Sequence, residues 1–538
     1  MLFNSYEFIF GFLPLTLAGF FLLGRVSRGW ALSWTILASL FFYAWWRPIN
    51  VLIIAPSIMV NFVLARALQH LGKSGRPAAA RAVLLLGIAF NVAFLGYFKY
   101  ANFAVGAAND VFGTGYVLSR IVLPLGISFI TFQKIAFLID VHAGRVESFR
   151  LQDYCLFVLF FPQLIAGPIV HYREMMPQFH RATCRLDQEN VAVGLTLFMF
   201  GLFKKVYLAD SLSPLVGGIY GHAAQGEAVS LLPAWMAAVG FTLQIYFDFS
   251  GYTDMALGIA RFFGIRFPPN FNSPLKATSI IDFWLRWHMT LTRFLTAYIY
   301  NPLALALTRR RAAQGLPGLG PRRPTVGSFA VLLFLPTIIT MLVSGVWHGA
   351  GYGFILWGLV HGLLLVINHG WRMGAPRAWR DARIMGPVGF LLTFVSVAAA
   401  MVLFRASTVP AAGRLLAGML GRHGIALPGP YFDRLGPLQS WLSRADTATA
   451  LGDFSDFKML TVWIVVGLGI ALCLPNTLQV LSAYEPALGV RPESRGWWTK
   501  VRALSWQPSP AWALLTSAIA AIGVLHLSGQ SEFLYWQF

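Results

Sequence analysis

Long apolar runs separated by short polar links are the dominant pattern of this 538-residue chain. A helix needs about 20 predominantly apolar residues to cross a bilayer. Runs near that length recur along the whole chain, at residues 6–24, 30–46, 50–65, 82–98, 121–141, 153–170, 191–209, 232–247, 329–347, 354–368, 386–404, 459–475 and 510–528. The pattern predicts an all-α polytopic membrane protein with about 11–13 transmembrane or re-entrant helices.

The composition supports the same class of protein. Hydrophobic residues make up 57% of the chain, charged residues make up 12%, and the mean hydropathy is +0.64. An ordinary soluble domain does not combine these values. The formal net charge of +20 would suit a nucleic-acid partner, but the cations stand in short links between apolar runs, as the positive-inside rule describes. We therefore expect the lipid bilayer as a partner and no nucleic acid.

The cationic clusters predict the orientation in the membrane. We assign to the cytoplasm the clusters Arg66–Arg81, Arg309–Arg311, Arg322 with Arg323, and Arg372–Arg383. No cation precedes Arg25, so the N-terminus is expected outside. Met1–Glu7 lacks a basic region, which favours an uncleaved first helix over a signal peptide. The longest polar connection, 406–458, mixes acidic and basic residues, and we place it at the outer face.

Two apolar runs, 329–347 and 354–368, are flanked by cations on the same side, so the chain is expected to enter and return as a hairpin. The break falls at Gly349–Gly353, which places His348 at the turn. Small residues around His348 allow a ligand or a neighbouring helix to approach closely. Tight helix packing is the simpler explanation of the same glycines.

A second histidine lies in the segment that begins at Ser279. Ser279 and Asp282 have the spacing of a capping box, so a helix is predicted from there to Asn301–Pro302. Trp284 and His288 would then share one helix face, and Asp282 with Arg286 would form an intrahelical ion pair. Trp284 and Trp287 suit an interfacial aromatic belt as well as a substrate tunnel.

Ionisable side chains in apolar membrane sequence are costly, so His288 and His348 are functional candidates. A neutral imidazole can take up a proton near pH 7, which fits a general base. The sequence shows no serine nucleophile elbow, no HExxH helix and no phosphate-cradling glycine loop. The three cysteines, Cys155, Cys184 and Cys473, are scattered, and we predict no metal site.

Several motif blocks occur in order over residues 1–371: Leu123–Phe129 with Asp140, Phe161–Ile169, Gly201–Lys205, Phe247–Met255, Phe283–His288 and Ser344–Gly351. These blocks resemble the membrane-bound O-acyltransferase family, in the branch typified by the alginate O-acetyltransferase membrane subunit. The resemblance implies a catalytic core over 1–371, with its motifs concentrated in 121–371. Residues 372–538 would add C-terminal transmembrane helices.

The resemblance also implies site roles and partners. His348 matches the catalytic histidine of the family, and His288 matches its other recurrent polar position. The helices would surround a central funnel that an acyl thioester, acetyl-CoA or an acyl carrier protein, enters from the cytoplasm, with no bound cofactor. A periplasmic acetyltransferase-like or esterase-like partner would complete transfer to an exported polysaccharide at the bacterial inner membrane.

We therefore predict that His348 deprotonates an acceptor hydroxyl and that His288 positions the donor or stabilises the oxyanion. Candidates for orienting these groups or binding substrate are Asp254, Asp248, Trp284, Arg286, Trp287 and Trp347. Transfer of D-alanyl groups from a carrier protein is an alternative. A transporter or flippase of acylated lipid or sugar, and a structural anchor for a polysaccharide synthase, remain rival functions without catalysis.

Overall fold

The computed structural model describes residues 1–319, 325–426, 434, 454–491, 501, 504–527 and 534. Its described residues form helices and no strand, which confirms the predicted all-α class. Arg322 and Arg323 lie outside the described residues, as do residues 427–433 and 435–453 of the polar connection 406–458. The helices pack into two compact units, which we treat separately. The predicted division at residue 371 stays a prediction, because these units reflect packing alone.

Unit 1 comprises residues 1–203, 250–270 and 477–537. Its helices are η1 (Glu7–Phe12), α1 (Leu13–Val26), α2 (Arg28–Ala44), α3 (Ile49–Lys73), α4 (Pro77–Leu95), η2 (Gly96–Tyr100), α5 (Ala101–Phe112), α6 (Ile127–His142), α7 (Leu151–Leu159), α8 (Phe161–Leu164), α9 (Tyr172–Arg181), α10 (Gln188–Phe203), α25 (Thr477–Val480), η8 (Ser482–Tyr484) and α26 (Pro510–Leu525).

Unit 2 comprises residues 204–249, 271–476 and 538. Its helices are η3 (Lys204–Ala209), α11 (Asp210–Ala224), η4 (Pro274–Lys276), α13 (Ile280–Arg286), α14 (Met289–Leu295), η5 (Thr296–Tyr300), α15 (Asn301–Ala313), α16 (Val326–Phe329), η6 (Ala330–Phe334), α17 (Leu335–His348), α18 (Tyr352–Gly374), α19 (Arg377–Arg380), α20 (Met385–Arg405), α21 (Val409–Met419) and α24 (Phe454–Cys473). Helix α12 (Leu231–Phe262) belongs to unit 2 as far as Phe249 and to unit 1 from Ser250.

Eight helices of the described part are long and apolar enough to cross a membrane: Glu7–Val26, Ile49–Lys73, Pro77–Phe112, Gln188–Ala224, Val326–His348, Tyr352–Gly374, Met385–Arg405 and Asp456–Cys473. Each falls on one of the predicted apolar runs. The run 232–247 lies in the 32-residue α12, and most other runs form shorter or interrupted helices. The run 121–141 gives the 16-residue α6, and the run 153–170 is divided between α7 and α8 at Phe160.

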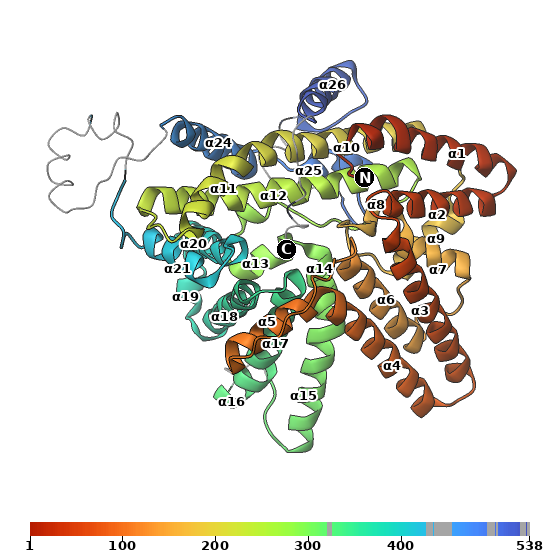
Figure 1. Ribbon diagram of the computed structural model, residues 1–538, viewed down its shortest axis with the longest axis horizontal. Coiled ribbons are helices and arrows are strands. Elements are labelled where there is room, and N and C mark those ends of the chain that lie inside the picture. Colours follow the sequence, from red (N-terminus) through yellow and green to blue (C-terminus); the bar gives the residue numbers. More distant parts are fainter. Residues whose placement is uncertain are drawn as a thin grey trace. The chain divides into compact units, whose positions relative to one another are not determined.

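Helices α3, α4 and α6 pack together in unit 1 (Figure 1). Buried polar side chains join them. The amide of Asn91 on α4 donates to the Asn61 side chain on α3 at 2.6 Å, and Lys134 on α6 donates to the Ser57 hydroxyl at 2.5 Å. Interhelical hydrogen bonds of this kind satisfy polar groups that hydrocarbon would leave unsolvated.

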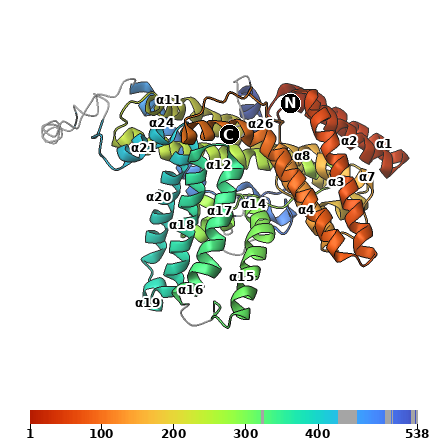
Figure 2. The ribbon, with the colours of Figure 1, turned by 60° about the horizontal axis from the view of Figure 1, so that its bottom comes forward.

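Helices α17 and α18 form the predicted hairpin of unit 2, and α20 packs beside α18 (Figure 2). Glycines bring the two arms together, since a Cβ atom at Gly345 would collide with the Phe354 carbonyl and one at Gly358 with the Met341 carbonyl. In Figure 2, α16, α19 and the last turn of α15 lie at one end of this unit. That end carries Arg309–Arg311 and the arginines of α19, as expected of one membrane face.

The helix predicted from Ser279 to Asn301 is interrupted, so that prediction was wrong. Ser279 does cap α13, accepting from the Asp282 amide at 3.1 Å. The chain then leaves the helix at Trp287, and His288 adopts a left-handed conformation, with φ 44° and ψ 50°, before α14 begins. Tertiary packing overrides helix propensity here, because the Trp287 ring is buried against Phe271 at 5.1 Å.

The predicted end of that helix at Asn301–Pro302 was also wrong. The chain continues from α14 through the π-helical η5 into α15. Pro302 lies in the first turn of α15, directly after the wider turn of η5, where its missing N–H is tolerated. One consequence concerns the site: Trp284 and His288 belong to separate elements and do not share a helix face.

Candidate active site

The two candidate histidines come together in unit 2. The ring centroids of His288 and His348 are 6.2 Å apart, and the ring planes are inclined by 59°. His348 is the last residue of α17, and His288 occupies the break between α13 and α14. Their exposed fractions are 4% for His348 and 0% for His288. Residues 60 positions apart therefore present two imidazoles to one buried region.

His288 is held by its surroundings in a conformation that few residues adopt. A positive φ is uncommon outside glycine, although histidine tolerates it better than branched side chains do. The ring packs edge-on against Phe249, with 4.7 Å between centroids. Burial lowers the pKa of His288 to about 3, so its imidazole is neutral at physiological pH. Strained residues of this kind concentrate at functional sites.

His348 sits in an aromatic environment. The Trp357 ring lies 5.0 Å away, the Phe404 ring 5.3 Å away and the Trp347 ring 4.9 Å away. Trp347 also approaches His288, at 6.0 Å. Gly349, directly after His348, is packed against the Phe354 ring, which leaves no space for a side chain. The turn of the hairpin thus fixes the position of His348.

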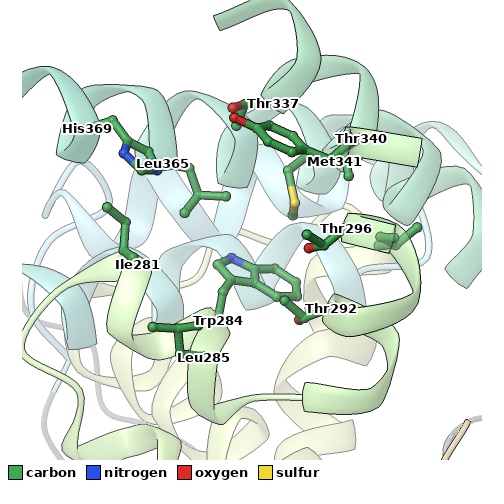
Figure 3. A pocket seen from close by; sticks show the side chains of 12 residues that line it. Ile281, Trp284, Leu285, Thr292, Thr296, Thr337, Thr340, Met341, Leu365 and His369 are labelled. Atoms are coloured by element: carbon green, nitrogen blue, oxygen red, sulfur yellow. The ribbon is translucent and has the colours of Figure 1, made fainter. Parts of the chain in front are cut away.

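A cavity of about 280 Å³ lies between α13, α14 with η5, α17 and α18 (Figure 3). It combines apolar walls with several hydroxyl groups and one imidazole. The lining residues are Ile281, Trp284, Leu285, Thr292, Leu295, Thr296, Tyr300, Thr337, Thr340, Met341, Leu365 and His369. Such a lining is typical of pockets that take a largely apolar ligand with a few polar groups.

Two indole rings lie between this cavity and His348. The Trp284 ring lines the cavity and packs against Trp357, with 5.8 Å between centroids. Trp357 in turn contacts His348. Within the described residues, neither indole N–H finds a hydrogen-bond acceptor. The Trp284 and Trp357 rings therefore separate the cavity from the His348 imidazole, and within the described part of the chain each ring has an N–H group free to donate a hydrogen bond.

Comparison with known proteins identifies related sequences. The sequence model described as "MBOAT, membrane-bound O-acyltransferase family" matches residues 143–315. A peptidoglycan O-acetyltransferase of Helicobacter pylori is 34% identical, over all of this chain and 98% of the relative. A Pseudomonas aeruginosa protein named "Probable alginate O-acetylase AlgI" is 37% identical, over 78% of this chain and 75% of the relative. A teichoic acid D-alanyltransferase of Streptococcus thermophilus is 27% identical over 52% of this chain.

The chain belongs to the membrane-bound O-acyltransferase family. It is accordingly a multi-pass membrane protein and an acyltransferase. Its relatives include proteins named as O-acetyltransferases. No group of three His, Cys, Asp or Glu side chains that could hold a metal ion occurs in the part of the chain that the structure describes.

The other residues predicted for the site of this acyltransferase have different environments. Trp347 and Trp284 contact the histidine region and the cavity, as described above. Trp287 stacks on Phe283 at 5.6 Å and is buried. Arg286 pairs with Asp282, with 2.8 Å between Nε and Oδ1, as the ion-pair interpretation predicted. The arrangement gives Arg286 a structural partner, and a role in substrate binding stays a prediction.

The two aspartates lie in different parts of α12. Asp248, in unit 2, is buried and forms an ion pair with Lys205 at 2.8 Å. Lys205 also pairs with Asp210 at 2.7 Å. Asp254 is buried in the part of α12 that belongs to unit 1. A role for either aspartate in orienting an imidazole stays a prediction.

Sequence reasoning missed a stripe on α18 that faces this region. Trp357, His361, Leu365 and His369 recur every four residues, which places them on one helix face. His361 is the second residue of this stripe. It is fully buried between the rings of Trp284 and Trp357, yet neither ring nitrogen has a hydrogen-bond partner among the described residues. The four-residue spacing could have identified this helix face from the sequence.

Proposed function

We propose that this acyltransferase moves an acetyl group from a cytoplasmic thioester towards hydroxyl groups of an exported polysaccharide, at the inner membrane of a bacterium. The observation that carries the proposal is the pair of neighbouring imidazoles, His288 and His348, close to a cavity that has apolar walls and a few polar groups. The acceptors named for the relatives, alginate and peptidoglycan, are both cell-surface polymers of sugars. Both relatives are named for O-acetylation, which favours acetyl as the transferred group.

The cavity suits the arm of a thioester donor, either acetyl-CoA or an acyl carrier protein. Its apolar walls would pack against the arm, and Thr292, Thr296 and Thr340 would meet amide groups along it. His369 marks the end near Arg372, on the side that we assign to the cytoplasm. Trp284 marks the end near Trp357 and hence His348.

The chemical step needs one base and one stabilised oxyanion. His348 takes the proton from the acceptor hydroxyl while that oxygen attacks the thioester carbonyl. The tetrahedral intermediate collapses with cleavage of the carbon–sulfur bond, and the protonated His348 returns the proton to the leaving thiolate. His288, neutral because of its burial, donates a hydrogen bond to the oxyanion or positions the donor. General-base assistance contributes about 10² to 10⁴ in rate.

A periplasmic acetyltransferase-like or esterase-like protein would receive the acyl group or present the polymer. The facing histidines are compatible with two routes. In direct transfer the acceptor hydroxyl attacks the thioester. In a relay an imidazole nitrogen attacks the thioester first and releases the thiol, and the acceptor hydroxyl then attacks the acyl-histidine and regenerates the imidazole. Residues on the cytoplasmic side would bring in the donor, and the partner would act on the other side.

A deletion strain tests this proposal. Exported polysaccharide from cells lacking the protein, and from cells complemented with it, is treated with mild base, and the released acids are identified. Acetate released only after complementation supports the proposal. D-Alanine in its place would favour the alternative represented by the teichoic acid D-alanyltransferase relative. No difference in released acid would contradict acyl transfer to polysaccharide and would mean that the acceptor is another molecule.

A further inference from the structure

A second cavity in unit 2, of about 760 Å³, lies where α13 begins, α18 ends and α20 begins. It borders a different face of α18 from the cavity described above. Its lining residues are Thr278, Ser279, Ile280, Leu364, Ile367, Asn368, Trp371, Arg372, Arg380, Asp381, Ala382, Met385, Gly386, Gly389, Leu392, Thr393 and Ser396. We call this cavity the α18–α20 groove.

One end of the groove is cationic. The Arg380 guanidinium donates to the Arg372 carbonyl at 2.8 Å, so the short link between α18 and α20 brings two arginines together. Asp381 is the acidic residue of the lining. Neither Arg372 nor Arg380 forms an ion pair with a residue that the structure describes. Two arginines at one short link, neither of them in an ion pair among the described residues, suit a phosphate group.

The rest of the groove is apolar and faces outward. Ile367 is 66% exposed and Leu392 is 61% exposed, although both belong to helices able to span a membrane. In a bilayer such side chains meet hydrocarbon. Trp371, close to the arginines, has the position of an interfacial aromatic residue. The groove therefore combines a phosphate-binding end with a surface for acyl chains.

Asn368 adds a polar contact between these two parts. Its amide oxygen is buried and has no hydrogen-bond partner within the described residues. Asn368 precedes Arg372 by four residues, which is about 6 Å along the helix axis. Buried polar atoms are normally paired, so this oxygen indicates a missing donor. A hydroxyl group of a glycerol-containing headgroup would supply one.

We propose that the α18–α20 groove binds an anionic glycerophospholipid. Its phosphate lies between Arg372 and Arg380, and its acyl chains follow Ile367 and Leu392. Charge complementarity selects an anionic lipid over a zwitterionic one. This binding does not depend on the acyl-transfer reaction proposed above.

Lipid binding at this groove would also affect the first cavity, because the two spaces share helices. Neighbouring residues line the two spaces: Ile280 and Asn368 line the groove, whereas Ile281 and His369 line the first cavity. Helices α13 and α18 thus form a shared wall. A lipid that holds α13 and α18 together would stabilise the shape of the first cavity.

The test compares lipid binding to the full chain in detergent, by native mass spectrometry with phosphatidylglycerol and with phosphatidylcholine. Wild type is expected to retain phosphatidylglycerol. The R372Q/R380Q variant is expected to bind it about 25-fold more weakly, because each arginine contributes about a factor of five. The control variant R309Q/R310Q removes the same charge from exposed positions of α15 and should bind as wild type does.

Equal phosphatidylglycerol binding by wild type and R372Q/R380Q would overturn the proposal, as would equal retention of the two lipids by wild type. Displacement of the lipid by coenzyme A would also overturn it, because the phosphate site would then belong to a donor. A measurement on wild type alone guards against a misfolded variant: phosphatidylglycerol, and not phosphatidylcholine, should raise the thermal unfolding midpoint. The absence of that difference would count against the lipid site.

Discussion

The Trp357 ring packs nearly perpendicular to the His348 ring, at 83° and 5.0 Å between centroids. Both residues belong to the α17–α18 hairpin, His348 at the end of one arm and Trp357 in the first turns of the other. The same indole contacts Trp284 at the wall of the cavity. Trp357 therefore supports both the imidazole and the cavity from one position.

Shortening Trp357 should damage the site through lost packing. Trp357→Ala is expected to cost about 3–5 kcal/mol in the free energy of unfolding and to abolish acyl transfer. Trp357→Phe keeps a ring beside His348 and should retain most of the activity. Thermal unfolding in detergent and ester formation in cells check the two variants together. Full activity of Trp357→Ala would show that the contact with His348 is dispensable.

A Gly→Ala substitution is expected to affect stability differently at two positions, one inside the hairpin and one outside it. Gly345→Ala places a Cβ atom against the backbone carbonyl of Phe354, which cannot yield easily, so a loss of about 1–3 kcal/mol is expected. Gly217→Ala, on α11, meets open space and should be neutral or gain up to about 1 kcal/mol from helix propensity. Unfolding midpoints of the two variants are the measurement. Equal stability would mean that the arms are not in close contact.

The buried pair of Lys205 and Asp248 predicts strong coupling. Lys205→Met should destabilise the protein by about 3–5 kcal/mol, because it leaves the Asp248 carboxylate buried without this partner. The double variant Lys205→Met/Asp248→Leu should recover much of that loss. Stability and ester formation are compared across the single and double variants. A stable but inactive double variant would instead assign Asp248 a role at the histidines.

The depressed pKa of His288 predicts a pH dependence of stability. In the unfolded chain this imidazole takes up a proton below about pH 6.5, whereas in the folded protein it stays neutral to about pH 3. The unfolded state thus binds more protons between these values, and stability falls as the pH falls through them. His288→Asn suits the left-handed backbone and removes the titration. The unfolding midpoint of wild type, relative to His288→Asn, should decrease from about pH 7 to about pH 4; a constant difference would contradict the burial of His288.

Much of the fold could be predicted because the bilayer imposes simple requirements on sequence. Apolar runs became helices, since backbone groups in hydrocarbon must pair within the segment. The glycine-rich break after His348 marked a hairpin turn, and Ser279 marked a helix start. These features are local, so a single sequence carries them. The pairing of Arg286 with Asp282 was predictable for the same reason, as an i, i+4 contact.

Other parts of the site depend on contacts between distant segments. The left-handed conformation of His288 follows from burial of the surrounding rings, which helix propensity cannot indicate. The cavity is lined by residues of α13, α14 with η5, α17 and α18, so no single segment reveals it. Trp357 and His361 were detectable as a four-residue repeat, but only their contacts with His348 and Trp284 give that repeat a meaning.

The most direct test of His348 as the catalytic base is the O-acetyl content of exported polysaccharide. It is compared in deletion cells complemented with wild type, His348→Ala or His222→Ala at matched membrane levels. His222 is an exposed histidine on α11, paired with Glu227, and serves as the matched control. His348→Ala is expected to lose the ester while polymer yield is unchanged, and His222→Ala is expected to keep it. Wild-type ester content with His348→Ala would contradict a catalytic base at this position.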